Sequence, residues 1–261
     1  MRFVRLFAIC LLIMFSFVGL GIAQEADEHV HASPGSEEGL GRAHMEISCS
    51  PAVAAKFDRA LALLHNFWYL RALDGFQQVS NDDPECGMAY WGAAMTYNHP
   101  FWDAPSSADE TAAWSLVQKG LAVKKVSPRE KLYLNAVAAL FKDAGAGPKA
   151  ARDEGYRDAM ATAYASFPDD ETKLFYGLAI LGTIKEGTKG FEHQLQAAAL
   201  FEEVYAHSPD HPGVLHYLIH VYDDPAHAEK GLEAARKYAK AAAAVPHALH
   251  MPSHIFTRLG H

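Results

Sequence analysis

The stretch that decides the fold runs from His211 to His254 and reads HPGVLHYLIHVYDDPAHAEKGLEAARKYAKAAAAVPHALHMPSH. It contains the spacing residue-x3-residue-x7-Pro, occupied by Ala234, Tyr238 and Pro246. A small residue followed one helical turn later by an aromatic residue lets two helices approach, and the proline ends the helix. The stretch also holds seven of the chain's fifteen histidines. The stretch therefore predicts a helical hairpin. It is also the part of the chain richest in histidine, and so in candidate functional side chains.

The same spacing recurs along the chain. Clear copies are Ala72/Phe76/Pro84 and Ala197/Phe201/Pro209, and weaker ones are Tyr156/Met160/Pro168 and Leu116/Gly120/Pro128. The five prolines lie 44, 40, 41 and 37 residues apart. This periodicity is typical of stacked hairpins, because one hairpin cannot bury its own apolar face. Alanine is abundant and β-branched residues are scarce, so we expect an all-α fold.

At these positions the sequence resembles the tetratricopeptide-repeat (TPR) family over residues 51–261, with Tyr90, Ala94 and Tyr97 matching the first helix of the second unit. The resemblance implies a right-handed α-solenoid of about five helix-turn-helix units plus an unpaired terminal helix. It also implies that the first helices line a concave face that binds ligands. The period exceeds the family's usual length of about 34 residues. Because no second helix follows Arg258, we expect a longer array than the sequence given.

The predicted helices alternate regularly after residue 51. A capping box at Ser127 and Glu130, with a proline at the first helical position, supports one of the starts. First helices are expected near 52–66, 86–98, 128–142, 170–183, 212–223 and 252–259. Their partners are expected near 69–80, 107–124, 149–166, 191–206 and 227–244.

The N-terminal segment, residues 1–23, has the order of a secretory signal peptide: Arg2 and Arg5, an apolar run, then small residues. An uncleaved anchor is the alternative, although the apolar run is short for a membrane span. We therefore expect a periplasmic or secreted protein without a membrane span after cleavage. Residues 24–50 are polar and predict a flexible tail before the helical domain of residues 51–261.

Cleavage would leave two cysteines, Cys49 and Cys86, with 36 residues between them. An even pair in an exported protein predicts a disulfide, and two buried free thiols are the alternative. The chain has 23 basic and 31 acidic residues and no basic run. This charge argues against nucleic acid and anionic membrane surfaces as partners.

Five histidines form the candidate metal site. His216 and His220 are four residues apart and share one helical face, a spacing that can hold zinc or copper. His247, His250 and His254 follow within eight residues on the next unit. The alternative is that these imidazoles are structural or contact a peptide.

The predicted function is that of an exported scaffold that binds a peptide or protein partner on its concave face. Candidate groove residues are His65, His99, Trp102 and Asp223. The alternative is a metal-binding protein or metalloenzyme that uses the five histidines and a divalent transition metal. No catalytic residue is assigned, because HExxH and similar motifs are absent, and a binding protein is favoured over an enzyme.

Overall fold

The computed structural model describes residues 39–101, 104–184 and 190–261, and every regular element in these ranges is a helix. The predicted signal peptide and Trp102 lie outside the described residues. A short 3-10 helix, Pro51–Val53, precedes the α-helices. These are α1 (Ala54–His65), α2 (Tyr69–Asp82), α3 (Gly87–Met95), α4 (Ser107–Ala122), α5 (Pro128–Gly145), α6 (Lys149–Ser166), α7 (Asp170–Gly182), α8 (Glu192–Tyr205), α9 (Pro212–Tyr222), α10 (Ala228–Ala241), α11 (Pro246–His250) and α12 (Pro252–Leu259).

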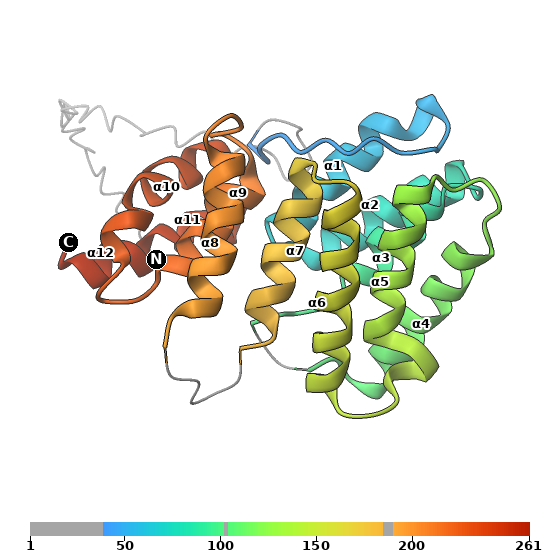
Figure 1. Ribbon diagram of the computed structural model, residues 1–261. Helices are drawn as coiled ribbons and strands as arrows, with labels where there is room; N and C mark the ends of the chain where they lie inside the picture. The colour runs from blue at the N-terminus through green and yellow to red at the C-terminus, as the bar shows by residue number, and fades with distance from the viewer. Residues whose placement is uncertain (1–38, 102–103, 185–189) are drawn as a thin grey trace, which may run out of the picture. The chain divides into compact units, whose positions relative to one another are not determined.

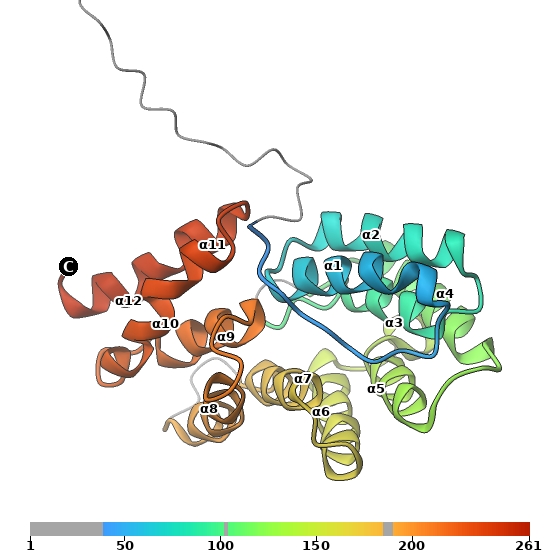
Figure 2. The same cartoon turned by 90° about the horizontal axis from the view of Figure 1, so that it is seen from above.

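Each helix from α1 to α10 packs against the next one along the chain (Figure 1). Odd-numbered helices also contact each other: α1 meets α3, α3 meets α5, and α7 meets α9. In addition, α1 contacts α9, although more than 140 residues separate them (Figure 2). The all-α prediction is confirmed, and the expected helices begin and end close to the observed ones.

Local signals explain several of the helix starts. Ser127 and Glu130 form the predicted capping box of α5, and Ser106 and Asp109 form a second one at α4. Asp169 caps α7 by accepting a hydrogen bond from the backbone N–H of Thr172. Near its end, α5 leaves helical geometry between Lys142 and Ala144.

The repeated small and aromatic residues lie in the core. Ala72, Phe76, Ala197, Phe201 and Tyr238 have no exposed surface. Phe76 packs against Gly92 of α3, and Phe201 packs against Gly177 of α7. The aromatic of each clear copy thus fills the space beside a neighbouring helix, as the spacing predicts.

Residues 39–50 differ from the predicted flexible tail, of which they are the described part. Leu40, Ala43 and Met45 are buried, so this extended segment belongs to the core. Its backbone is also fixed at both ends: Gly39 accepts a hydrogen bond from Ala244 N–H, and Ser48 donates to Glu130. The prediction was wrong for these residues because a mostly polar sequence does not reveal that a few of its apolar side chains become buried when the chain folds.

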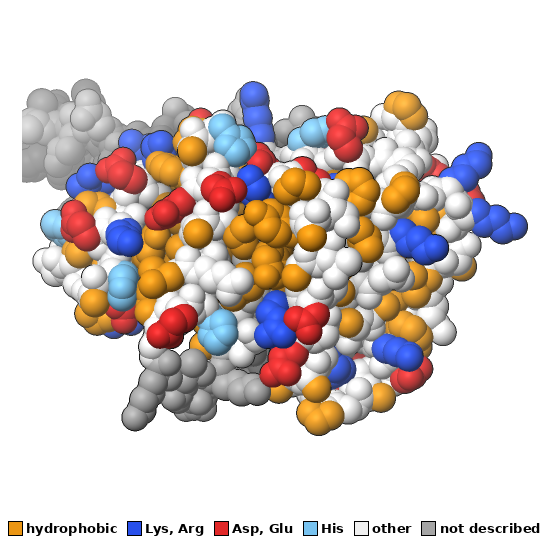
Figure 3. All heavy atoms as spheres, in the orientation of Figure 1, with side chains coloured by type: hydrophobic (Ala, Val, Ile, Leu, Met, Phe, Trp, Pro, Cys, Tyr) orange, Lys and Arg blue, Asp and Glu red, His pale blue; other side chains and the backbone are white. Residues whose placement is uncertain are grey.

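Cys49 and Cys86 form a disulfide, the pair expected from the sequence. It links the extended segment to the start of α3. Charges are mixed on the face drawn in Figure 3, where Lys and Arg side chains alternate with Asp and Glu. Within the described ranges, no helix is both long and apolar enough to cross a bilayer.

Candidate metal centre

Helix α9 carries the first two histidines of the site. Its start is fixed by Pro212 at the first helical position and by His211, whose ring accepts a hydrogen bond from Gly213 N–H. His216 and His220 then fall one turn apart, with ring centroids separated by 4.8 Å. The predicted shared face is confirmed.

The third histidine comes from α11, a short helix that the sequence reading did not separate from its neighbours. It begins at Pro246 and places His247 beside α9. Nε2 of His216 lies 2.9 Å from Nε2 of His247 and 3.1 Å from Nε2 of His220. Two nitrogen ligands about 2.0–2.1 Å from one metal ion, with an angle of about 90–110° between the bonds, are about 2.9–3.4 Å apart. Both pairs that include His216 therefore have the spacing of metal ligands, and the ligand atoms of all three residues lie within 4.8 Å of one another.

The tautomer of His216 is fixed by its other nitrogen. Nδ1 of His216 lies 2.7 Å from the backbone carbonyl oxygen of His65, which can only accept a hydrogen bond. Nδ1 therefore carries the proton, and Nε2 presents a lone pair toward His220 and His247. Such a hydrogen bond to the outer nitrogen is characteristic of histidines that bind metals.

Aromatic rings enclose the three histidines. The ring of Phe67 lies 4.3 Å from that of His216, and Phe101 stacks on His220 at 4.3 Å. Tyr238 also stacks on His216, with ring centroids 5.2 Å apart. Phe67 has a φ of +54°, an uncommon conformation for a bulky side chain that places its ring over the histidines. The enclosure limits access of water to the site.

Burial keeps these imidazoles neutral. Desolvation, reinforced by the neighbouring histidines, lowers the pKa of His216 well below its usual value. The same cause lowers the pKa of His220 to about 3 and that of His247 to about 4. A neutral imidazole has one unprotonated nitrogen, which is the form that binds a metal ion.

His250 and His254, the other two predicted ligands, form a pair of their own. Their Nε2 atoms are 3.1 Å apart, one at the end of α11 and the other in α12. Asp223, a predicted groove residue, lies beside this pair: one of its oxygens is 2.8 Å from Nδ1 of His254, and the other accepts a hydrogen bond from Arg258. The five predicted ligands thus divide into a group of three and a pair.

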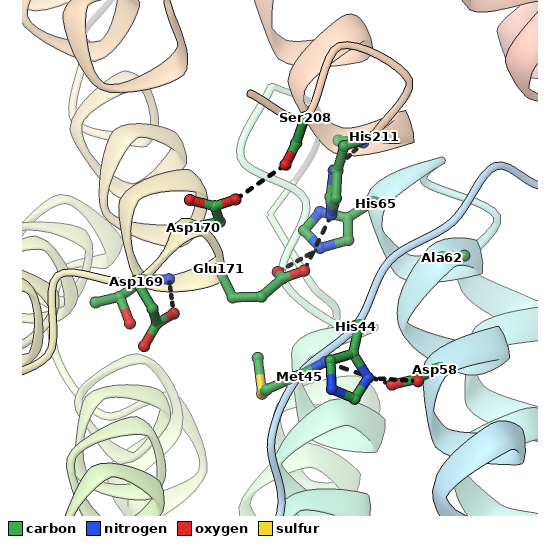
Figure 4. Close-up of polar contacts among 12 residues, drawn as sticks. His44, Met45, Asp58, Ala62, His65, Asp169, Asp170, Glu171, Ser208 and His211 are labelled. Carbon is green, nitrogen blue, oxygen red and sulfur yellow. Dashed lines mark hydrogen bonds and ion pairs between the residues drawn. The ribbon is translucent and has the colours of Figure 1, made fainter. Parts of the chain in front are cut away.

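A second group, which the sequence reading missed, consists of His65, Glu171 and His211 (Figure 4). Nε2 of His65 lies 2.8 Å from one carboxylate oxygen of Glu171, and Nε2 of His211 lies 3.0 Å from the other. Desolvation favours a neutral Glu171, but the two histidines outweigh it and lower the pKa of the carboxyl. Glu171 follows two aspartates at a helix start, where an acidic residue is expected for capping alone.

Two of the predicted groove residues occupy other surroundings. His65 is fully buried between α7 and α9, so it is not part of an open groove. Half-buried His99 lies against Tyr69, with tilted rings whose centroids are 4.4 Å apart, and contacts the carbonyl oxygen of Thr96. Both side chains thus make contacts within the fold.

The two groups of three residues differ in whether direct hydrogen bonds account for the contacts among their members. Around Glu171, both carboxylate oxygens meet N–H donors, and the remaining nitrogens of His65 and His211 pair with Tyr217 and Gly213. Nε2 of His216 instead meets two other imidazole nitrogens, although its single lone pair can accept only one hydrogen bond. A cation bound by Nε2 of His216 would use this lone pair directly, and the other two nitrogens lie within reach of the same ion. Comparison of the chain with protein-family models, curated proteins and solved structures finds no match.

Proposed function

We propose that this protein binds a divalent transition metal ion, zinc or copper, through Nε2 of His216, His220 and His247. The observation that carries the proposal is the convergence of the three nitrogens, with Nε2 of His216 2.9 and 3.1 Å from the other two. Imidazole ligands suit both metals. The carbonyl of His65 and the aromatic enclosure support it, because they orient a ligand and exclude water.

Three protein ligands leave a coordination position open in a four-coordinate ion. Water or a small ligand would complete it, as in zinc sites that polarise a bound molecule. The proposed frame is a TPR-type α-solenoid in which the ligands come from α9 and from α11, the short helix after the last clear repeat. The peptide-binding scaffold expected from the sequence remains a prediction, since no contact of the described residues favours it over the metal site.

The test is the metal content of untagged protein purified without chelator, measured by inductively coupled plasma mass spectrometry. Zinc and copper are then titrated into chelator-stripped protein by calorimetry. We expect tight binding of at least one ion per chain. Replacing a hydrogen-bonding partner of a ligand typically costs about 10–100-fold in affinity, so loss of a ligand in His247→Ala should cost more than about 100-fold.

His220→Ala and His216→Ala complete the series, with circular dichroism to check that each variant folds. Half-buried His247 is the safest of the three to replace, since His216 is fully buried. The matched control is His44→Ala/His207→Ala, which removes two exposed histidines that contact carboxylates elsewhere. Absence of tight binding in the parent chain, or unchanged binding in folded His247→Ala and His220→Ala, would overturn the proposal.

A further inference from the structure

His250 and His254 repeat, closer to the solvent, the arrangement that marks the three-histidine site. Their Nε2 atoms face each other at 3.1 Å, a separation that fits two ligands of one ion. His250 is exposed and the side chain of His254 is 34% exposed, so solvent reaches the pair. The pair lies at the junction of α11 and α12, four residues apart in sequence.

Asp223 fixes the tautomer of His254. Its Oδ2 lies 2.8 Å from Nδ1 of His254, so Nδ1 donates to the carboxylate and Nε2 keeps a lone pair directed at His250. Arg258 donates to the other oxygen and holds the carboxylate in place. A carboxylate that accepts from the outer nitrogen of a histidine orients the ring and makes it a better metal ligand.

The pair adjoins the buried site. The rings of His216 and His247 are 4.8 Å apart, those of His247 and His250 are 6.4 Å apart, and those of His250 and His254 are 4.9 Å apart. The imidazoles thus form a continuous row that leads from the buried side chain of His216 to the exposed one of His250.

We propose that Nε2 of His250 and Nε2 of His254 bind a second transition metal ion, next to the three-histidine site and open to solvent. The proposal rests on the proposed metal-binding function and extends it to a centre of two ions. Asp223 is a positioning residue of the second site. With two protein ligands and the rest supplied by water, the second ion binds more weakly and exchanges faster than the buried one.

Calorimetric titration of Zn²⁺ into the chelator-stripped full chain tests the proposal. We expect two ions per chain, one tight and one weak. His250→Ala/His254→Ala should abolish the weak event and leave the tight one, whereas His247→Ala should impair the tight event. Asp223→Asn, which keeps the shape of the side chain, should weaken the second event by about 10–100-fold without changing the first.

The control variant His44→Ala/His207→Ala should still bind both ions, because its exposed histidines contact carboxylates at other places in the fold. A parent chain that binds one ion, with affinity unchanged in His250→Ala/His254→Ala, would overturn the second site and leave the proposed function standing. A single ion lost only in His250→Ala/His254→Ala would support the pair and overturn the three-histidine site. No binding at all would overturn both.

Discussion

At the scale of single residues, Glu171 holds three helices together. The carboxylate belongs to α7 and is 3% exposed, and it accepts hydrogen bonds from His65 at the end of α1 and His211 before α9. A buried charge is tolerated only where such partners compensate for its lost hydration. His65 also accepts, through its backbone carbonyl, a hydrogen bond from Nδ1 of His216, so the triad adjoins the proposed metal ligands without joining them.

We expect Glu171→Gln to lower the free energy of unfolding by about 1–3 kcal/mol at pH 7, because the carboxylate accepts hydrogen bonds from two buried histidines and the amide leaves one of those N–H groups without an acceptor. Since the pKa of the folded-state carboxyl lies below its ordinary value, its contribution is present above about pH 4.5 and is lost as the pH falls further. The difference in unfolding free energy between parent and variant should therefore become smaller in acid. Urea unfolding monitored by circular dichroism at pH 7 and pH 4 measures both values.

Glu203→Gln is the matched control for this prediction. Like Glu171, Glu203 is a carboxylate with a side-chain partner. It forms an ion pair with Lys173, but its side chain is 56% exposed. An exposed pair is worth about 0–1 kcal/mol, so this variant should be nearly neutral. The role given to the buried triad would be contradicted if the two substitutions lowered the free energy of unfolding equally. It would also be contradicted if the loss in Glu171→Gln did not change with pH.

At the scale of helices, glycine determines how closely neighbours pack. A Cβ added to Gly177 of α7 would lie 2.3 Å from the ring of Phe201 on α8. A Cβ added to Gly155 of α6 would meet its nearest neighbour, Ala139, at 3.6 Å, an ordinary contact. Both glycines lie inside helices, so they need the same helical backbone conformation. They differ in how closely the neighbouring helix packs against them.

We expect Gly177→Ala to destabilise the protein by about 1–3 kcal/mol, because the added methyl group overpacks the contact with Phe201. Gly155→Ala should be neutral or stabilise by up to about 1 kcal/mol, since alanine favours the helix. Thermal unfolding of the two variants compares them directly. A Gly177→Ala variant as stable as Gly155→Ala would show that α7 and α8 do not need the close approach.

At the scale of the whole described chain, the extended segment 39–50 joins elements that are far apart in sequence. Its first residue pairs with Ala244 after α10, Leu40 accepts a hydrogen bond from Asn66 after α1, and Ser48 meets Glu130 of α5. Asn66 in turn accepts from the hydroxyl group of Tyr238 in α10. The disulfide anchors the end of the segment to α3.

We expect Cys49→Ser/Cys86→Ser to lower the free energy of unfolding by about 3–4 kcal/mol, the value of the chain-entropy model for a separation of 37 residues. Urea denaturation of the oxidised parent and the variant measures the difference. Reduced parent protein is the control and should unfold near the variant. An unchanged transition midpoint would mean that the noncovalent contacts of the segment already fix it.

The sequence by itself determined the helices and their order. Recurring small, aromatic and proline residues set the hairpins, and caps such as Ser127 with Glu130 set individual starts. These signals act within a few residues, so they can be read along the chain. The shared face of His216 and His220 follows from the same local periodicity.

Only the tertiary structure decided which histidines come together. His65 reaches His216 because α1 contacts α9, and it also reaches Glu171 of α7; no local pattern records either contact. Likewise, His247 and His250 both belong to the short helix α11, yet the first meets His216 of α9 and the second meets His254 of α12. The physical reason is that helical periodicity fixes the direction of a side chain on its own helix, whereas its neighbours depend on the packing of distant helices.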